Sequence, residues 1–185
     1  MSAPAKTTDG EIRRVARRLL ELHGMEGVTM AAVAEEVGVR APSLYKRFAS
    51  KPDLLRAVTR EALGELSAQM EQAARGEEAR GSLERMAGEY RAFAKANPRV
   101  YELIFTPAEG EDLEARKASV VPLFAVLGGA IGQERALPAA RLLVAFLHGY
   151  VTMEMQGLFQ LGGSVDDGFA FGLATILDGL PWGRG

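Results

Sequence analysis

Residues 29–48 read TMAAVAEEVGVRAPSLYKRF, and this stretch decides the fold of the first part of the chain. Gly38 suits the positive φ that ends one short helix, and Pro42 suits the first turn of the next. Ala34 is small where two helix backbones must approach closely. The apolar residues expected between the two helices are Val33, Val37, Val39, Leu44 and Phe48. The pattern predicts a helix-turn-helix, in which a helix over 42–48 crosses a helix over 30–37.

The second of these helices carries a basic end that contains no acid. Packing the apolar residues inward leaves a set of side chains pointing outward: Arg40, Ala41, Ser43, Lys46 and Arg47. Residues 1–56 hold ten Lys or Arg and seven Asp or Glu, a net of +3, while residues 57–185 hold twelve and seventeen, a net of −5. A basic head on an acidic body indicates a polyanionic partner for the head alone.

The rest of the chain has helical periodicity and no convincing strand. A capping pattern at Thr8–Glu11 starts the first helix, and Gly24 is expected to end it. Its apolar stripe is Ile12, Val15, Ala16, Leu19 and His23. Further breaks predict helices over 51–74, 82–97, 99–105, 111–131, 138–161 and 165–178. We therefore expect an all-α fold of about nine helices.

Length and composition narrow the function classes. The 185 residues suit a DNA-binding head over 1–56 and a helical body over 57–185. The absence of cysteine excludes disulfides and thiolate metal sites, and two histidines far apart do not predict a metal centre. The first ten residues lack a signal-peptide pattern, and the apolar stretch 142–161 is interrupted by polar side chains. We expect a cytoplasmic protein without a membrane span, metal or cofactor.

The head resembles the TetR family of bacterial transcriptional regulators over residues 11–58. The resemblance is carried as a set by Gly24, Gly27, Thr29, Val33-Ala34, Gly38-Val39, Leu44-Tyr45, Phe48, Lys51 and Leu54-Leu55. The body is similar to the WHG type of TetR C-terminal domain, through Tyr90-Arg91-Ala92-Phe93-Ala94, Asn97-Pro98, Tyr101, Phe105 and Phe146-Leu147-His148-Gly149. Phe146 stands where that type often has tryptophan.

The resemblance implies a homodimeric repressor that releases double-stranded operator DNA when a small ligand enters the C-terminal domain. Three residues match positions that contact phosphates in the family: Thr29, Tyr45 and Lys51. Four match the region that faces the major groove: Arg40, Ala41, Ser43 and Lys46. The family often has a serine cap where this chain has Arg40, so Pro42 must do more to start the helix, and base readout is expected to depend on Arg40 and Ser43.

The body is expected to bind an effector and a second copy of the chain. It carries ten of the thirteen aromatic residues, and the predicted pocket residues are Tyr101, Phe105, Phe124, Phe146, His148, Tyr150 and Met153. Glu154 could orient a polar ligand group, although ordinary core packing explains each of these residues as well. The body has no basic cluster, which favours a small, largely apolar effector. The predicted dimer interface consists of Leu142, Phe146, Phe169, Gly172 and Ile176 on the last two long helices.

Two other function classes remain open on the sequence alone. The chain has no nucleophile elbow, phosphate-binding glycine loop, dinucleotide fingerprint or zinc-protease motif, so we expect no enzyme. A helical adaptor, or a small-molecule-binding protein without sequence-specific DNA binding, would leave the basic window unexplained. Binding to duplex DNA that survives moderate salt would distinguish a regulator from both.

Overall fold

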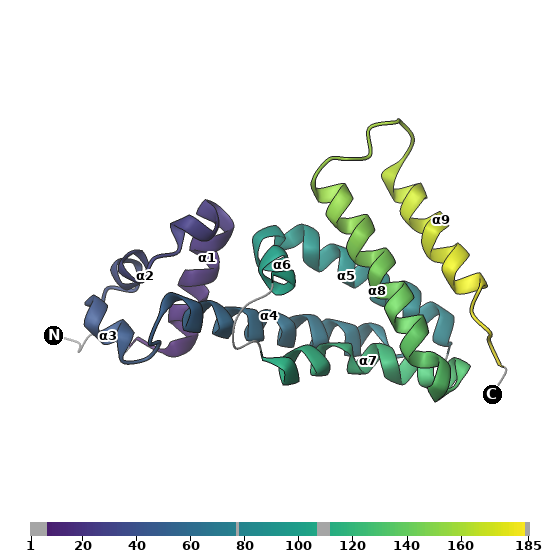
Figure 1. The fold of residues 1–185 in the computed structure, drawn as a ribbon, viewed down its shortest axis with the longest axis horizontal. Helices are drawn as coiled ribbons and strands as arrows, with labels where there is room; N and C mark the ends of the chain where they lie inside the picture. The colour runs from purple at the N-terminus through teal and green to yellow at the C-terminus, as the bar shows by residue number, and fades with distance from the viewer. Residues whose placement is uncertain (1–6, 77, 107–111, 184–185) are drawn as a thin grey trace. The chain divides into compact units, whose positions relative to one another are not determined.

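The computed structural model describes residues 7–76, 78–106 and 112–183, and over these ranges the chain forms nine helices and no strand (Figure 1). The helices are α1 Asp9–Gly27, α2 Met30–Glu36, α3 Ala41–Tyr45, α4 Lys51–Ala73, α5 Ala79–Ala96, α6 Pro98–Phe105, α7 Leu113–Ile131, α8 Gln133–Met155 and α9 Val165–Asp178. The all-α prediction is confirmed.

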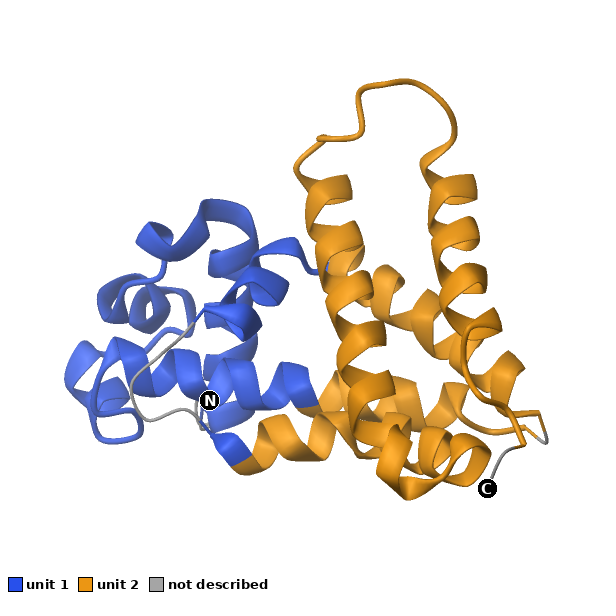
Figure 2. Ribbon diagram, turned by 45° about the vertical axis from the view of Figure 1, so that its right-hand side comes forward, with its two compact units in different colours: residues 1–63, 97–113 blue, residues 64–96, 114–185 orange. Residues whose placement is uncertain are grey.

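The described residues form two compact units (Figure 2). Unit 1 consists of residues 1–63 and 97–113, and unit 2 of residues 64–96 and 114–185. Unit 1 therefore contains the helix-turn-helix, the first part of α4 and also α6, which comes much later in the sequence. The predicted division of function at residue 56 stays a prediction.

Helices α2 and α3 meet through a glycine turn of the predicted kind. Gly38 has φ of +71°, and its N–H donates to the carbonyl of Glu35. The N–H of Val39 reaches back to the carbonyl of Ala34 at 2.9 Å. These two bonds form a Schellman motif, which satisfies the last carbonyls of α2 and turns the chain sharply into α3.

Two helix boundaries differ from the predictions because of proline and glycine. Helix α8 starts at Gln133 rather than 138, and Pro138 lies inside it, at the cost of one backbone hydrogen bond. The same helix ends at Met155 rather than 161, because Gly157, with φ of +66°, closes a second Schellman motif there.

Helix α1 also departs from the expected ending. Gly24 has non-helical backbone angles, as predicted for a stop, but helical turns resume and continue to Gly27. Ile12, Ala16 and Leu19 are buried as expected, whereas His23 is exposed and does not belong to the apolar stripe.

Candidate nucleic-acid interface

The exposed end of α3 presents polar and basic side chains that folding leaves largely unused. Leu44 and Phe48 point inward and are buried, and they seat α3 on the rest of unit 1. Arg40, Ser43 and Lys46 are exposed. The small aliphatic core of the head thus fixes α3 by one face and leaves the opposite face open.

The start of α3 lacks an ordinary side-chain cap. Arg40 occupies the N-cap position without a side-chain hydrogen bond, and Pro42 lies in the first turn. The sequence predicted this arrangement from the absence of a serine at position 40. The N–H of Ser43 already donates to the carbonyl of Arg40 at 2.8 Å, so the group left to face an anionic partner here is the Arg40 guanidinium.

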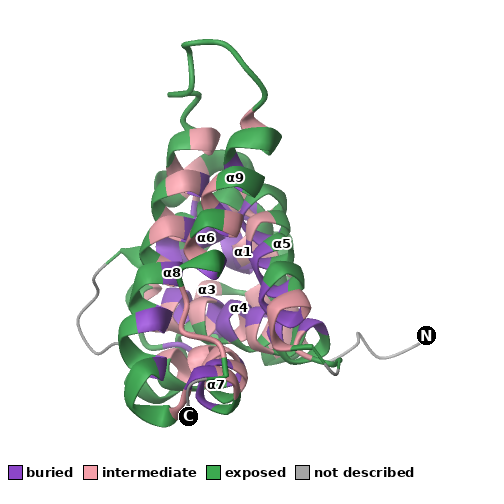
Figure 3. Ribbon diagram, turned by 90° about the vertical axis from the view of Figure 1, so that its right-hand side faces the viewer, coloured by how far each residue is buried: buried purple, intermediate pink, exposed green. Residues whose placement is uncertain are grey.

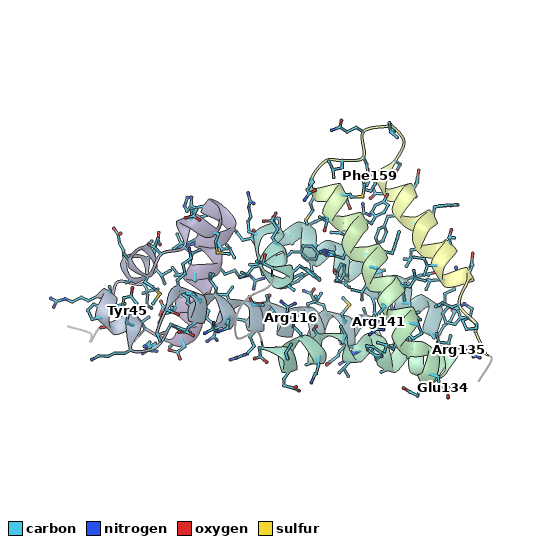
Figure 4. All side chains as sticks on the ribbon, in the orientation of Figure 1. Tyr45, Arg116, Glu134, Arg135, Arg141 and Phe159 are labelled. Carbon is cyan, nitrogen blue, oxygen red and sulfur yellow. The ribbon has the colours of Figure 1, made fainter. Side chains whose placement is uncertain are left out.

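Thr29 and Tyr45 lie at the surface in different ways. Thr29 caps α2 by accepting a hydrogen bond from the N–H of Ala32 at 3.0 Å, and its side chain remains exposed. The ring of Tyr45 is 51% exposed on α3 (Figure 4). Ala41 is half-buried, so of the predicted groove residues it offers the least surface.

Lys51 has a structural contact that the sequence did not predict. Its ammonium donates a hydrogen bond of 2.6 Å to the carbonyl of Met25, near the end of α1. A lysine ammonium has three N–H donors, so this bond leaves two for a phosphate. Lys51 therefore joins the first turn of α4 to α1, and this bond fixes the position of the positive charge.

Arg47 does not point freely outward as expected. Its guanidinium makes an ion pair with Asp9, at the start of α1. The pair ties the end of the recognition helix to α1, and it removes one positive charge from the predicted docking surface. The ion pair of Arg47 could not be predicted from the sequence, because it depends on the start of α1 lying beside the end of α3.

In the body, the predicted pocket residues are divided between the two units. Tyr101 and Phe105 belong to α6 in unit 1, where their ring centroids are 5.0 Å apart. The other five lie on α7 and α8 in unit 2. Met153 is 42% exposed, and the burial of His148 lowers the pKa of its imidazole. The seven residues stay predictions as ligand contacts.

The aromatic residues of α8 and α9 pack on one another within one chain. Phe146 stacks on Phe169 with centroids 5.8 Å apart, and Tyr150 meets the edge of Phe169 at 5.4 Å. A Cβ added at Gly172 would lie 2.5 Å from the Phe146 ring, so this glycine permits the close approach of α9 to α8. The ring of Tyr150 also contacts Phe159 at 4.6 Å.

The predicted dimer interface stays a prediction, and its five residues differ in how much surface they offer within one chain. Phe169 is only 7% exposed and packs between α8 and α9. Gly172 and Phe146 likewise pack within the chain, and Ile176 is half-buried. Leu142 is 52% exposed and remains available.

Glu154 belongs to an ion network within the body, and its expected role toward a ligand stays a prediction. Arg91 of α5 donates two hydrogen bonds of 2.7 Å to its carboxylate, and Lys95 donates another of 2.7 Å. The hydrogen bonds from Arg91 lower the pKa of Glu154, and the same bonds raise the pKa of Arg91. Arg91 also pairs with Asp166 and lies 4.7 Å from the Phe169 ring centroid. The network joins α5, α8 and α9.

Two further observations concern metals and membranes. Among residues 7–76, 78–106 and 112–183, no group of three or more His, Asp or Glu side chains could hold a metal ion. Within the same ranges, α8 alone is long and apolar enough to cross a membrane, a test that core helices of soluble proteins also pass.

The fold and this exposed basic helix end define a helix-turn-helix DNA-binding protein with a helical C-terminal domain. Residues 12–58 match the family model described as bacterial regulatory proteins, tetR family, and residues 83–176 match the one described as tetracyclin repressor-like, C-terminal domain. The chain belongs to the TetR family of transcriptional regulators.

Relatives agree with this assignment. The chain is 32% identical over 166 residues to the "Uncharacterized HTH-type transcriptional regulator Rv0681" of Mycobacterium tuberculosis, a match that covers 86% of this chain and 76% of the relative. It is 25% identical to the HTH-type regulator YobS of Bacillus subtilis, over 97% of this chain and 96% of that protein.

Solved structures show the same fold along nearly the whole chain. A Rhodococcus protein described as having unknown function has a TM-score of 0.83 and 26% identity, over 97% of this chain and 99% of that one. A TetR variant from Acinetobacter baumannii, solved in complex with minocycline, has a TM-score of 0.69 and 24% identity, over 94% and 96%.

Proposed function

We propose that this regulator is a homodimeric repressor that binds operator DNA through α3 and releases it when a small, largely apolar effector binds the C-terminal domain. It works in the cytoplasm and catalyses no reaction. The observation that carries the proposal is the exposed basic surface of α3, where the side chains of Arg40, Ser43 and Lys46 make no hydrogen bond or ion pair with the described residues.

The DNA-binding roles differ from residue to residue. Arg40 is suited to reading bases, because a guanidinium can grip guanine through two hydrogen bonds. Thr29 at the start of α2, Tyr45 at the end of α3 and Lys51 at the start of α4 are suited to phosphate contacts, which set orientation without reading sequence. Ser43 offers a small, adaptable hydroxyl to bases.

Dimerisation is supported by an apolar stripe on α8 that faces solvent within this chain. Leu142, Ala145, Gly149 and Met153 are exposed and follow one another at helical spacing. On α9, Phe171 is 75% exposed (Figure 3 shows the exposed faces of both helices). A second copy that covers these side chains would build a four-helix bundle.

An effector site in the body is supported by the family and by one neighbour. The Acinetobacter TetR variant is described in complex with minocycline, a small molecule. In this chain His148 and Thr152 lie one turn apart on α8, and the Thr152 hydroxyl is buried without a hydrogen-bond partner. Such a hydroxyl is free to bind a polar atom of an otherwise apolar ligand.

The decisive experiment selects binding sites from random duplex DNA with the full chain, followed by affinity measurement at several salt concentrations. A repeated motif with two half-sites, bound at moderate salt by a dimer in ultracentrifugation, is the expected result. Binding without sequence preference, or none, would favour the adaptor alternative. Compounds can then be screened for release of the selected operator.

A further inference from the structure

Helix α6 begins without a cap of its own. Asn97 occupies its N-cap position but makes no capping hydrogen bond with its side chain, and Pro98 has no N–H to satisfy. The free donors of the first turn are therefore the N–H groups of Arg99 and Val100. These donors need an acceptor from elsewhere in the protein.

Helix α1 supplies that acceptor. The carboxylate of Glu21 accepts a hydrogen bond from the N–H of Val100 at 2.9 Å and another from the N–H of Arg99 at 3.1 Å. A negative charge at this position also interacts favourably with the dipole of α6. Glu21 thus caps a helix that lies almost eighty residues away in the sequence.

A second side chain of α1 holds the same end of α6. Arg17, one turn before Glu21, donates a hydrogen bond of 2.9 Å from its guanidinium to the side-chain oxygen of Asn97. The Asn97 side chain is therefore directed to α1 rather than to its own helix. Two neighbouring polar groups of α1 fix both the N-cap residue and the first turn of α6.

Apolar burial accompanies these polar contacts. Val100, Tyr101 and Ile104 of α6 are fully buried, and so are Ala16 and Leu20 of α1. Apolar packing alone tolerates sliding, whereas two directed hydrogen bonds at a helix end fix its register. The polar contacts therefore specify how α6 packs on α1.

Helix α6 lies between helices of the other unit along the chain. It follows α5 and precedes α7, and both belong almost entirely to unit 2. The chain thus enters the DNA-binding unit for one short helix and leaves it again.

We propose that Glu21 is a positioning residue, which fixes the first turn of α6 against α1. Operator affinity then depends on this contact, because α1 belongs to the same unit as the helix-turn-helix. This proposal rests on the proposed DNA-binding function. Glu21 acts through α1, which also contacts Arg47, just after α3, and Lys51, in the first turn of α4.

The first test measures amide hydrogen exchange in the free protein. Glu21→Ala should speed exchange of the Arg99 and Val100 amides roughly tenfold, the size expected for loss of a helix cap. Glu21→Gln, which keeps one acceptor oxygen, should speed it less. Glu26→Ala is the matched control, because Glu26 is exposed on α1 and its side chain makes no hydrogen bond or ion pair with the described residues. Unchanged exchange in Glu21→Ala would overturn the proposal.

The second test separates positioning from simple capping. In the double variant Glu21→Ala with Asn97→Ser, the serine can cap α6 locally, but both polar contacts with α1 are gone. We expect exchange protection to return while affinity for the selected operator stays at least fivefold below wild type, the lower end of ordinary coupling between sites. Restored operator affinity would show that Glu21 is only a cap and would overturn the positioning role.

The two proposals fail in different ways. A wild-type chain that selects no duplex would contradict the proposed function, and with it the dependence of operator affinity on Glu21. In that case the exchange experiment on the free protein still decides whether Glu21 caps α6.

Discussion

The end of α3 and the contact between α8 and α9 use their side chains in opposite ways. Along α3, a helix of five residues, Ser43 and the two capping residues Arg40 and Lys46 are exposed to solvent. Between α8 and α9, Phe146 and Phe169 are committed to one another. In the first region, polar side chains remain exposed and available to a partner. In the second, the aromatic side chains are used to pack α8 against α9.

The comparison shows which kind of residue points to function. An aromatic residue in a helical body can be explained by packing, and Phe169 is a plain example. A basic side chain that makes no cap hydrogen bond and no ion pair with the described residues needs another explanation, and Arg40 is such a residue. The contrast can be tested with variants in both regions.

The largest effect is expected for Phe169→Ala. Phe169 is buried, stacks on Phe146 and lies beneath the Arg91 guanidinium, so its removal leaves a cavity at the meeting point of α5, α8 and α9. Loss of a buried phenylalanine costs about 3–5 kcal/mol. Chemical denaturation at fixed protein concentration measures the change.

Phe171→Ala is the matched control two residues along the same helix. Phe171 is 75% exposed, so we expect the fold of the single chain to be nearly unaffected, but self-association measured by ultracentrifugation to weaken. Equal losses of unfolding free energy in both variants under dimer-free conditions would contradict the assignment of Phe169 to the core and Phe171 to the surface.

The next largest effect is expected for Glu154→Gln, which leaves the Arg91 guanidinium without its main partner. Hydrogen bonds to charged groups contribute about 1.5–3 kcal/mol, and Asp166 still holds part of the charge, so we expect a loss of about 2 kcal/mol at neutral pH. Thermal or chemical unfolding of the two proteins checks this value.

The pH dependence of that difference has a definite sign. Arg91 lowers the pKa of Glu154 in the folded protein, so the stabilisation is present above the unfolded-state pKa of about 4.3. It is lost as the pH falls through the lower folded pKa. The gap between wild type and Glu154→Gln should therefore shrink below about pH 4. A gap that widened in acid would contradict the role given to Arg91.

The sequence predicted the local structure of the head well, because each signal there acts on its immediate neighbours. Gly38 ends α2, Pro42 lies in the first turn of α3, and Thr29 caps α2. In α8 the same signals are less decisive. Pro138 suits a helix start, yet the helix already begins at Gln133 and continues through it, and the stop lies at Gly157 rather than near residue 161.

Contacts between distant segments could not be predicted from the sequence. The pairing of Arg47 with Asp9, and the capping of α6 by Glu21, depend on which helices lie side by side. The sequence contains only the capacity of these side chains to pair. The ion pair between Glu154 and Arg91 is a third such contact, because its two residues come from different helices.

A smaller effect, with a distinct signature, is expected for Arg40→Ala. If Arg40 grips a guanine through two hydrogen bonds, its loss should cost about 1–3 kcal/mol at one base pair in each half-site. Selection from random DNA should then show relaxed preference at that position and unchanged preference elsewhere. A uniform loss across all positions would place Arg40 on phosphate.

The smallest effect is expected for Lys51→Met, which should lower the affinity for DNA to the same extent whatever the base sequence. The ammonium of Lys51 is directed by its hydrogen bond to Met25, and its remaining donors suit a phosphate rather than a base edge. Removing it should weaken all duplexes about equally and reduce the slope of log affinity against log salt by about one for each head, since each neutralised phosphate contributes about 0.9.

The thermal midpoint of Lys51→Met must be measured alongside, because the carbonyl of Met25 also loses a partner, at a cost of about 1 kcal/mol. That cost applies to the free protein at every salt concentration, whereas the phosphate contribution grows as salt is lowered. The two roles of Lys51 therefore separate in one titration series. An altered base preference with an unchanged salt slope would mean that Lys51 reads sequence, and that α4 rather than α3 lies nearest the bases.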